Sequence, residues 1–232
     1  MAEINTFQKS AMLEELFGKT NWLRSMEITD LILTSYYPDI CLRQQLSAAD
    51  VLELLRRSSF SGLFIASMNM LRTDVLYKSR IHGQRHIERT AILSGCLALL
   101  LGLSEREFLL CLEAAKYHDT GRILDGEDPE HGRRSARKIP DLCRSYTETE
   151  QTLLQAVITA HSLPDREELP VFRYYCKNDI EAYRKYRSMI KILKDADALD
   201  RFRLSCHSLD IRYLRLNESH RLLRAACELV NM

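Results

Sequence analysis

A histidine and an aspartate stand side by side at the end of an apolar stretch, and this pair limits what the chain can fold into. The segment Lys116–Arg122 reads KYHDTGR. The residues before it predict a helix, because Ser104 and Glu107 have the spacing of a capping box and Phe108 begins an apolar stripe. Gly121 can end that helix. An imidazole and a carboxylate pack poorly in an apolar core, but together they can hold a divalent metal ion.

Most of the seven histidines lie in one part of the chain, each near the end of a predicted helix. They are His82, His86, His118, His131 and His161. Helix ends can converge on one point while the helix bodies pack together. Taken singly, each histidine is expected to be a structural or surface residue, but the whole set is poorly explained in that way.

Local signals place these histidines at helix ends. Gly83 allows His82 to lie in a loop and His86 to lie in the first turns of the following helix. The segment Asp128–Glu130 offers an N-cap residue followed by proline at the first helical position. This arrangement predicts that His131 lies in the first turn of another helix.

The second half of the chain continues the helical pattern. A second capping box, Thr147–Glu150, opens the helix that leads to His161. The polar, tyrosine-rich stretch 164–186 is expected to form a loop and the start of a helix, able to cover a site. Apolar residues then lead into the acidic segment Lys194–Arg201.

The chain as a whole is expected to be all-α. It has 232 residues, is 46% hydrophobic and contains only 8 Gly and 5 Pro, which is typical of a mostly helical globular protein. Further helices are predicted around residues 11–17, 26–35, 48–57, 63–77 and 219–230. We expect residues 1–78 to form an N-terminal helical extension, serving as a cap or a homodimer surface, and residues 79–232 to form the domain that carries the histidines.

Composition excludes several kinds of partner. With 33 basic and 32 acidic residues the net charge is +1, so bulk charge gives no indication of nucleic acid or a membrane surface. The 7 cysteines show no CxxC spacing, which indicates free thiols in a reducing compartment. There is no signal-peptide pattern and no apolar run of about 18 residues. We therefore expect a cytoplasmic protein without a membrane partner.

The ordered set of histidines and aspartates resembles the HD-domain superfamily of metal-dependent phosphohydrolases. That family has a histidine at the start of one helix, an HD doublet at the end of another, and a later aspartate. His86 matches the first element, although Thr90 stands where valine is more usual, and His118 and Asp119 match the doublet. Asp195 matches the final aspartate. The resemblance covers about residues 79 to 216 and implies an HD-domain helical bundle with an N-terminal helical extension.

The resemblance also implies a metal site. His131 and His161 resemble the additional positions that binuclear members use. The implied metal ligands are His86, His118, Asp119, His131, His161 and Asp195. This set is sufficient for one or two divalent ions, with Asp119 as a candidate bridge. Its nitrogen content suits Mn, Fe, Co, Ni or Zn better than Mg.

The implied reaction is hydrolysis of a phosphomonoester or phosphodiester bond, with a nucleotide or nucleotide derivative as the expected substrate. A metal ion lowers the pKa of bound water, so the expected nucleophile is a metal-bound hydroxide. By the same resemblance, Arg122 is expected to neutralise the phosphate, and Lys194 is a second candidate for that role. His82 can donate a proton to the leaving group or hold the substrate.

Several alternatives stay open at this point. The chain can instead be a metal-stabilised regulatory or interaction module without turnover, or a di-iron oxygenase. Arg122 can simply neutralise the end of its helix, and Asp197, Asp200 and Arg201 can form a structural charge network. The basic run Arg133–Arg137 is typical of a solvated face, although it can also attract a polyanionic substrate.

Overall fold

The computed structural model describes residues 22–177 and 179–232, and every regular element within these ranges is a helix. The α-helices are α2 (Trp22–Tyr36), α3 (Ala48–Arg57), α4 (Ser61–Asn69), α5 (Gln84–Leu100), α6 (Glu105–Tyr117), α7 (His131–Ala136), α8 (Ile139–Leu142), α9 (Glu148–His161), α10 (Glu168–Cys176), α11 (Ile180–Leu199) and α12 (Leu223–Val230). Short 3₁₀ helices are η1 (Leu42–Gln44), η2 (Thr73–Val75), η3 (Asp165–Glu167), η4 (Asp200–Arg203), η5 (Ile211–Tyr213) and η6 (Glu218–Arg221). The all-α prediction is confirmed.

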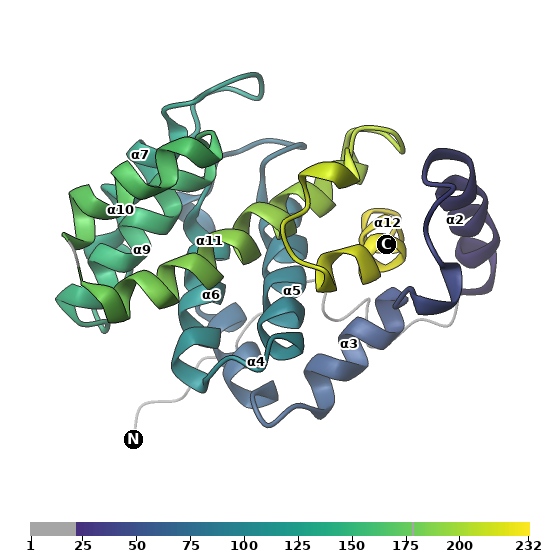
Figure 1. Cartoon of the computed structure of the whole chain (residues 1–232), viewed down its shortest axis with the longest axis horizontal. Helices are drawn as coiled ribbons and strands as arrows, with labels where there is room; N and C mark the ends of the chain where they lie inside the picture. Colours follow the sequence, from purple (N-terminus) through teal and green to yellow (C-terminus); the bar gives the residue numbers. More distant parts are fainter. Residues whose placement is uncertain (1–21, 178) are drawn as a thin grey trace.

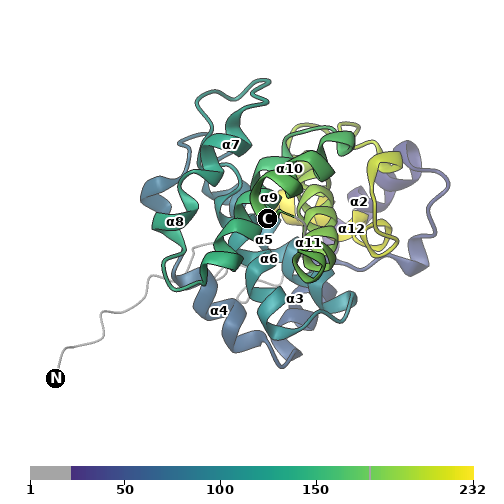
Figure 2. The same ribbon diagram turned by 60° about the vertical axis from the view of Figure 1, so that its left-hand side comes forward.

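Four helices make the centre of the bundle. Helices α5, α6, α9 and α11 all pack against one another except α5 and α9, and their inner faces are fully buried (Figure 1). Leu97, Leu112, Leu154 and Ile190, one from each helix, are all at 0% exposure. Helices α7 and α10 pack on the outer side of α9, and Figure 2 shows these three side by side. Burial of these apolar faces supplies most of the stabilisation, because isolated helices of this length are marginal in water.

The described part of the N-terminal region shares the core of the bundle. Helix α3 packs on α5 so closely that a Cβ atom on Gly95 would come within 3.2 Å of the Leu55 side chain. Helix α4 packs on α6, where the buried ammonium group of Lys116 donates to Glu113 at 2.7 Å and to the Ser67 carbonyl at 3.1 Å. The division at residues 78 and 79 and the homodimer stay predictions. The helix expected around residues 11–17 lies outside the described residues.

Most helix starts follow the capping signals in the sequence. Capping boxes begin α6 at Ser104 and α9 at Thr147, which confirms those predictions, and a third capping box begins α3 at Ser47. The expectation for residues 164–186 was wrong in part, because η3 and α10 occupy residues 165–176 and α11 begins within the stretch, at Ile180. Helix α4 ends at Asn69, earlier than the predicted 77.

The turn after the His–Asp doublet differs from the expectation for Gly121. Helix α6 ends at Tyr117, with His118 as its C-cap, so Gly121 does not terminate it. Instead the turn lies against α7, where a Cβ atom on Gly121 would come within 2.3 Å of the Ser135 amide nitrogen and 2.5 Å of the His131 carbonyl oxygen. Glycine is required here for close approach of two backbones.

Replacing Gly121 with alanine is expected to destabilise the protein by about 3 kcal/mol or more, because the added methyl group meets backbone that cannot move aside. The matched control is Gly62→Ala in α4, where an added Cβ meets nothing within 4 Å. That change is expected to be neutral or to stabilise by about 0.5–1 kcal/mol. Urea unfolding followed by circular dichroism measures both, and equal stability of the two variants would contradict the packing account.

Candidate metal centre

Five histidines and two aspartates converge where four helix ends meet the side of α11. His82 lies in the loop before α5 and His86 in the first turn of α5, as Gly83 predicts, since Gly83 is the N-cap of that helix. His118 caps α6, while His131 is the first residue of α7 and His161 the last residue of α9. Helix α7 begins at His131 with Glu130 as N-cap, so Asp128 is not its cap as expected. All five histidines are buried.

Hydrogen bonds fix the orientation of four of these imidazole rings. Nδ1 of His86 donates to the Asp200 carboxylate at 2.7 Å, and Nδ1 of His118 donates to the Ala115 carbonyl at 2.8 Å. Nδ1 of His161 donates to the Ile158 carbonyl at 2.5 Å, and Nδ1 of His131 donates to the carbonyl of Asp128. A carbonyl oxygen and an ionised carboxylate only accept, so these nitrogens carry a proton, and in the neutral ring Nε2 then carries a free lone pair.

The Nε2 atoms of these four rings face each other two by two. Nε2 of His86 lies 3.1 Å from Nε2 of His118, and Nε2 of His131 lies 2.9 Å from Nε2 of His161. Two lone pairs at this distance repel each other unless a cation lies close to both of them. The pairs therefore have the donor chemistry of a metal site, and the outer hydrogen bonds have the form that usually supports histidine ligands.

The carboxylate of Asp119 lies between the two pairs. Its Oδ1 is 3.0 Å from Nε2 of His131 and 3.7 Å from Nε2 of His161, whereas its Oδ2 is 3.5 Å from Nε2 of His86 and 3.7 Å from Nε2 of His118. Oδ1 is buried and has no hydrogen-bond partner among the described residues. A buried carboxylate oxygen without a partner is costly, so the residues fit a divalent cation here.

The electrostatic environment keeps His118, His161 and Asp119 in the form that binds metal. Burial lowers the pKa of His118 to about 3 and also lowers the pKa of His161, so both rings are neutral at pH 7. Burial alone would raise the pKa of Asp119, but contacts with His118, His131 and His161 hold it well below its usual value. Burial would lower the pKa of His86, but hydrogen bonds that its ring donates to the Asp119 and Asp200 carboxylates outweigh burial and raise it.

Asp197, and not Asp195, is the aspartate that α11 contributes to this cluster. Oδ1 of Asp197 lies 3.4 Å from Nε2 of His86. Burial would raise the pKa of Asp197, but His86, His118 and Arg203 lower it below its usual range. Side chains two residues apart on an α-helix point in directions about 200° apart, so Asp195 and Asp197 cannot share one face.

The carboxylate of Asp195 holds a different part of the chain. Its two oxygens accept from the backbone N–H groups of Arg215 at 2.8 Å and Leu216 at 2.9 Å, and from the Ser219 hydroxyl at 2.8 Å. The structure therefore does not bring Asp195 to the histidines. It secures the segment before α12 against α11.

Asp200 supports the cluster from behind. It accepts from His86 and also from both Nε and Nη2 of Arg89, with Arg203 Nη1 at 3.4 Å. These contacts explain why the Asp200 carboxylate has a lowered pKa although it is buried. From the sequence, Asp200 was expected to belong to a structural charge network. The only signal in the sequence that links Asp200 to this centre is its spacing of three residues from Asp197.

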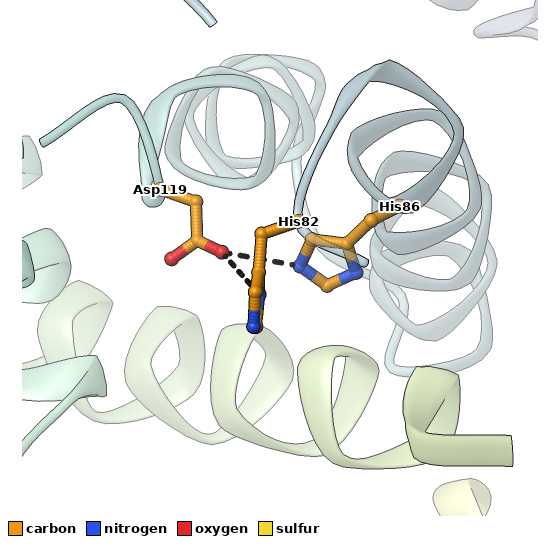
Figure 3. Close-up of side chains that lie close together, drawn as sticks. All are labelled: His82, His86 and Asp119. Atoms are coloured by element: carbon orange, nitrogen blue, oxygen red, sulfur yellow. Dashed lines mark hydrogen bonds and ion pairs between the residues drawn. The ribbon is translucent and has the colours of Figure 1, made fainter. Parts of the chain in front are cut away.

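The three residues expected to act on a substrate lie in different surroundings. Nδ1 of His82 is 3.1 Å from Oδ2 of Asp119, and Figure 3 shows the two side chains together with His86. Arg122 donates through Nε to the same Oδ2 at 2.8 Å. Lys194 instead donates to three acceptors: the Leu163 carbonyl, Asp165 and Glu168, at 3.0, 2.7 and 2.7 Å.

A cavity of about 340 Å³ lies beside the cluster and is lined in part by His161 and Asp197. Three cationic residues, Lys194, Arg201 and Arg215, also line it. Among the described residues, the Arg201 side chain bonds only the Ser208 carbonyl, through Nε at 2.9 Å, so its terminal nitrogens are available. Sequence reasoning placed Arg201 in a charge network, and no pattern in the sequence distinguishes it.

The order of these residues along the chain matches a known family. The HD domain model matches residues 83–202, which is more than half of the chain and spans α5 to η4. The chain belongs to the HD domain family. The buried histidine and aspartate cluster of this HD domain fits divalent metal binding, with three overlapping groups of ligand atoms within 4.8 Å of one another. They are His82, His86 and Asp119; His86, His118 and Asp197; and His118, Asp119 and His161.

Other comparisons add no relative. Neither the curated proteins nor the solved structures gave a match to this HD domain. Within residues 22–177 and 179–232, none of the helices combines the length and the apolar character needed to cross a bilayer.

Asp197 and Asp195 are expected to respond differently to replacement with alanine. Asp197→Ala should weaken metal binding by at least about tenfold with little change in stability, because the carboxylate is partly exposed. Asp195→Ala should keep metal affinity but lower the free energy of unfolding by about 2–4 kcal/mol, since buried donors lose their acceptor. Calorimetric Mn²⁺ titration and urea unfolding test both, and a loss of metal restricted to Asp195→Ala would reverse the assignment.

Proposed function

We propose that this HD domain is a metal-dependent phosphohydrolase that cleaves a phosphomonoester or phosphodiester bond of a nucleotide or nucleotide derivative. The observation that carries the proposal is the Asp119 carboxylate between two pairs of imidazoles whose lone pairs face each other. We infer one or two divalent ions, of Mn, Fe, Co, Ni or Zn rather than Mg. When bound, such ions supply Lewis acidity and lower the pKa of water.

The ligands divide into two sets that share one carboxylate. In the first set, Nε2 of His86 and of His118 lies near Oδ2 of Asp119, and Oδ1 of Asp197 lies 3.4 Å from Nε2 of His86. Nε2 of His131 and of His161 lies near Oδ1, which is the second set. In this proposal Asp119 bridges the two sets, and Asp197 takes the place that the sequence suggested for Asp195.

The protein's own groups then position the substrate. Arg201 is the best candidate for the phosphate, because its terminal nitrogens are available in the cavity and its guanidinium suits phosphate oxygens. Arg122 keeps the Asp119 carboxylate ionised and oriented. Lys194 shapes the cavity wall by holding Asp165 and Glu168.

His82 is the candidate proton donor to the leaving group. Its Nδ1 faces Asp119, with Nη2 of Arg203 at 3.3 Å. Nε2 of His82 has no hydrogen-bond partner among the described residues, so it is the nitrogen that can exchange a proton. The ring is 8% exposed, which leaves access for a small substrate.

The adjacent cavity favours a small phosphate ester. About 340 Å³ is within the range of small-ligand pockets and too small for a duplex. Tyr213 lines the cavity and is 69% exposed, so it offers a ring on which a base can stack. These features support a nucleotide as substrate.

The test is phosphate release from a nucleotide panel by metal-stripped protein to which Mn, Co, Ni or Mg is added. Asp119→Asn should abolish turnover in every metal without unfolding the chain, because it removes the shared anionic ligand. Arg201→Ala should raise KM by about tenfold with a smaller effect on kcat, because it removes a charge-assisted contact to phosphate. Arg184→Ala, an exposed arginine paired with Glu181, is the matched control.

Full activity of Asp119→Asn would exclude the proposed chemistry. Metal binding without turnover of any panel member would favour a metal-stabilised module instead.

A further inference from the structure

A second cavity lies between α7, α9 and α10, on the outer side of the bundle. Its volume is about 500 Å³, and it shares no lining residue with the cavity beside the histidines. Its polar and aromatic lining comes from α7 and its C-cap (Arg133, Arg137), η3 (Glu167), α9 (Gln155, Thr159) and α10 (Tyr174, Tyr175). Figure 2 shows the three helices that enclose it.

The α7 wall of this cavity is positively charged. Arg133 and Arg137 are four residues apart, so they lie on one face of the helix, and both are exposed. The Arg137 guanidinium has no ion pair or hydrogen bond with the described residues, and the ion pair of Arg133 with Glu130 is long, at 3.9 Å, and exposed. The one carboxylate in the lining, Glu167, lies 3.5 Å from Arg166. Two available guanidinium groups side by side suit the oxygens of a phosphate chain.

The α10 wall offers aromatic rings. Tyr174 is 81% exposed, and its ring lies almost perpendicular to that of Tyr175, with 4.9 Å between centroids and 88° between planes. So exposed a tyrosine ring gains little stabilisation from burial, and a nucleotide base stacked on it would cover its apolar face.

The α9 wall offers oriented polar groups. The Thr159 hydroxyl is buried and donates to the Tyr175 hydroxyl at 3.2 Å, which leaves the phenolic proton of Tyr175 available to a ligand. The Gln155 side-chain nitrogen donates to the Ala136 carbonyl at 3.2 Å. This bond fixes the amide, and its oxygen accepts no hydrogen bond from the described residues, so it can accept from a base amino group.

We propose that this cavity binds a nucleotide carrying two or more phosphates, at a site separate from the metal centre. The phosphates lie against Arg133 and Arg137, and the base stacks on Tyr174. The cavity spans the helix that begins with His131 and the helix that ends with His161, so the ligand contacts elements that hold two of the imidazoles. This inference does not depend on the proposed hydrolytic activity.

The probe is α,β-methylene-ADP, whose bridging carbon resists hydrolysis, titrated calorimetrically into the full-length, metal-loaded protein. The double variant Arg133→Ala/Arg137→Ala and the single variant Tyr174→Ala should each weaken one binding event by about tenfold or more. Arg173→Ala, an exposed arginine on α10 that does not line the cavity, is the matched control for lost charge and should leave that event unchanged. Thermal unfolding should be the same for all variants, since the replaced side chains are exposed.

Arg201→Ala separates the two sites, because it should affect only binding beside the metal centre. The proposal is overturned if every binding event is lost in Arg201→Ala, or if the double variant binds the probe as tightly as the unmodified protein. It is also overturned if pyrophosphate binds as tightly as the probe and Tyr174→Ala has no effect, since that result describes a simple anion site. No heat of binding at a probe concentration of about 1 mM would likewise contradict it.

Discussion

The hydrogen bonds behind the histidines are the constraint on which the site depends. Each of four Nδ1 atoms is committed to an acceptor, and three of those acceptors are backbone carbonyls three residues earlier in the chain. The ring directions are therefore set by local backbone geometry at helix ends. Because the helix ends converge, the Nε2 lone pairs point at one another and at one carboxylate. A fold that buried the same residues without these bonds could let the rings turn away.

The facing imidazoles and the Asp119 carboxylate lower the stability of the folded protein, and the packing of the rest of the bundle offsets this loss. Opposed lone pairs and a buried carboxylate oxygen without a partner each cost on the order of 1–3 kcal/mol. The apolar faces of α5, α6, α9 and α11 offset that cost, and the close approach at Gly121 locks the doublet turn against α7. A cation bound between the two pairs would remove the repulsion, so the cost of this arrangement would add to the affinity for metal.

Much of the fold and of the cluster follows from local signals in the sequence. Two capping boxes, at Ser104 and Thr147, mark helix starts correctly because the cap is a contact between residues three apart. The sequence also predicts that the five histidines lie near helix ends, since a helix start or stop signal lies close to each of them. The start of α10 has no such cap, and the sequence therefore predicts only a loop and the start of a helix for the stretch 164–186.

Local signals do not predict toward which neighbour a helical side chain points, or which residues far apart in the sequence come into contact. Asp195 and Asp197 are both compatible with the sequence pattern, and only the rotation of α11 against α5 and the segment before α12 separates their roles. The Arg201 guanidinium is available to a ligand because nearby carboxylates pair with other cations. Asp165, for example, pairs with Lys194 and Arg215. The role of Gly121 depends on a backbone contact with α7, 14 residues away at Ser135.

Anomalous X-ray diffraction from crystals of the Mn²⁺-loaded protein tests whether the cluster around Asp119 holds divalent metal. We expect an anomalous peak about 2.0–2.3 Å from the Asp119 carboxylate and the facing Nε2 atoms. A second peak on the other side of the same carboxylate would establish the binuclear form. Crystals with no anomalous peak at Asp119, and with the histidine rings in the positions described above, would contradict the account.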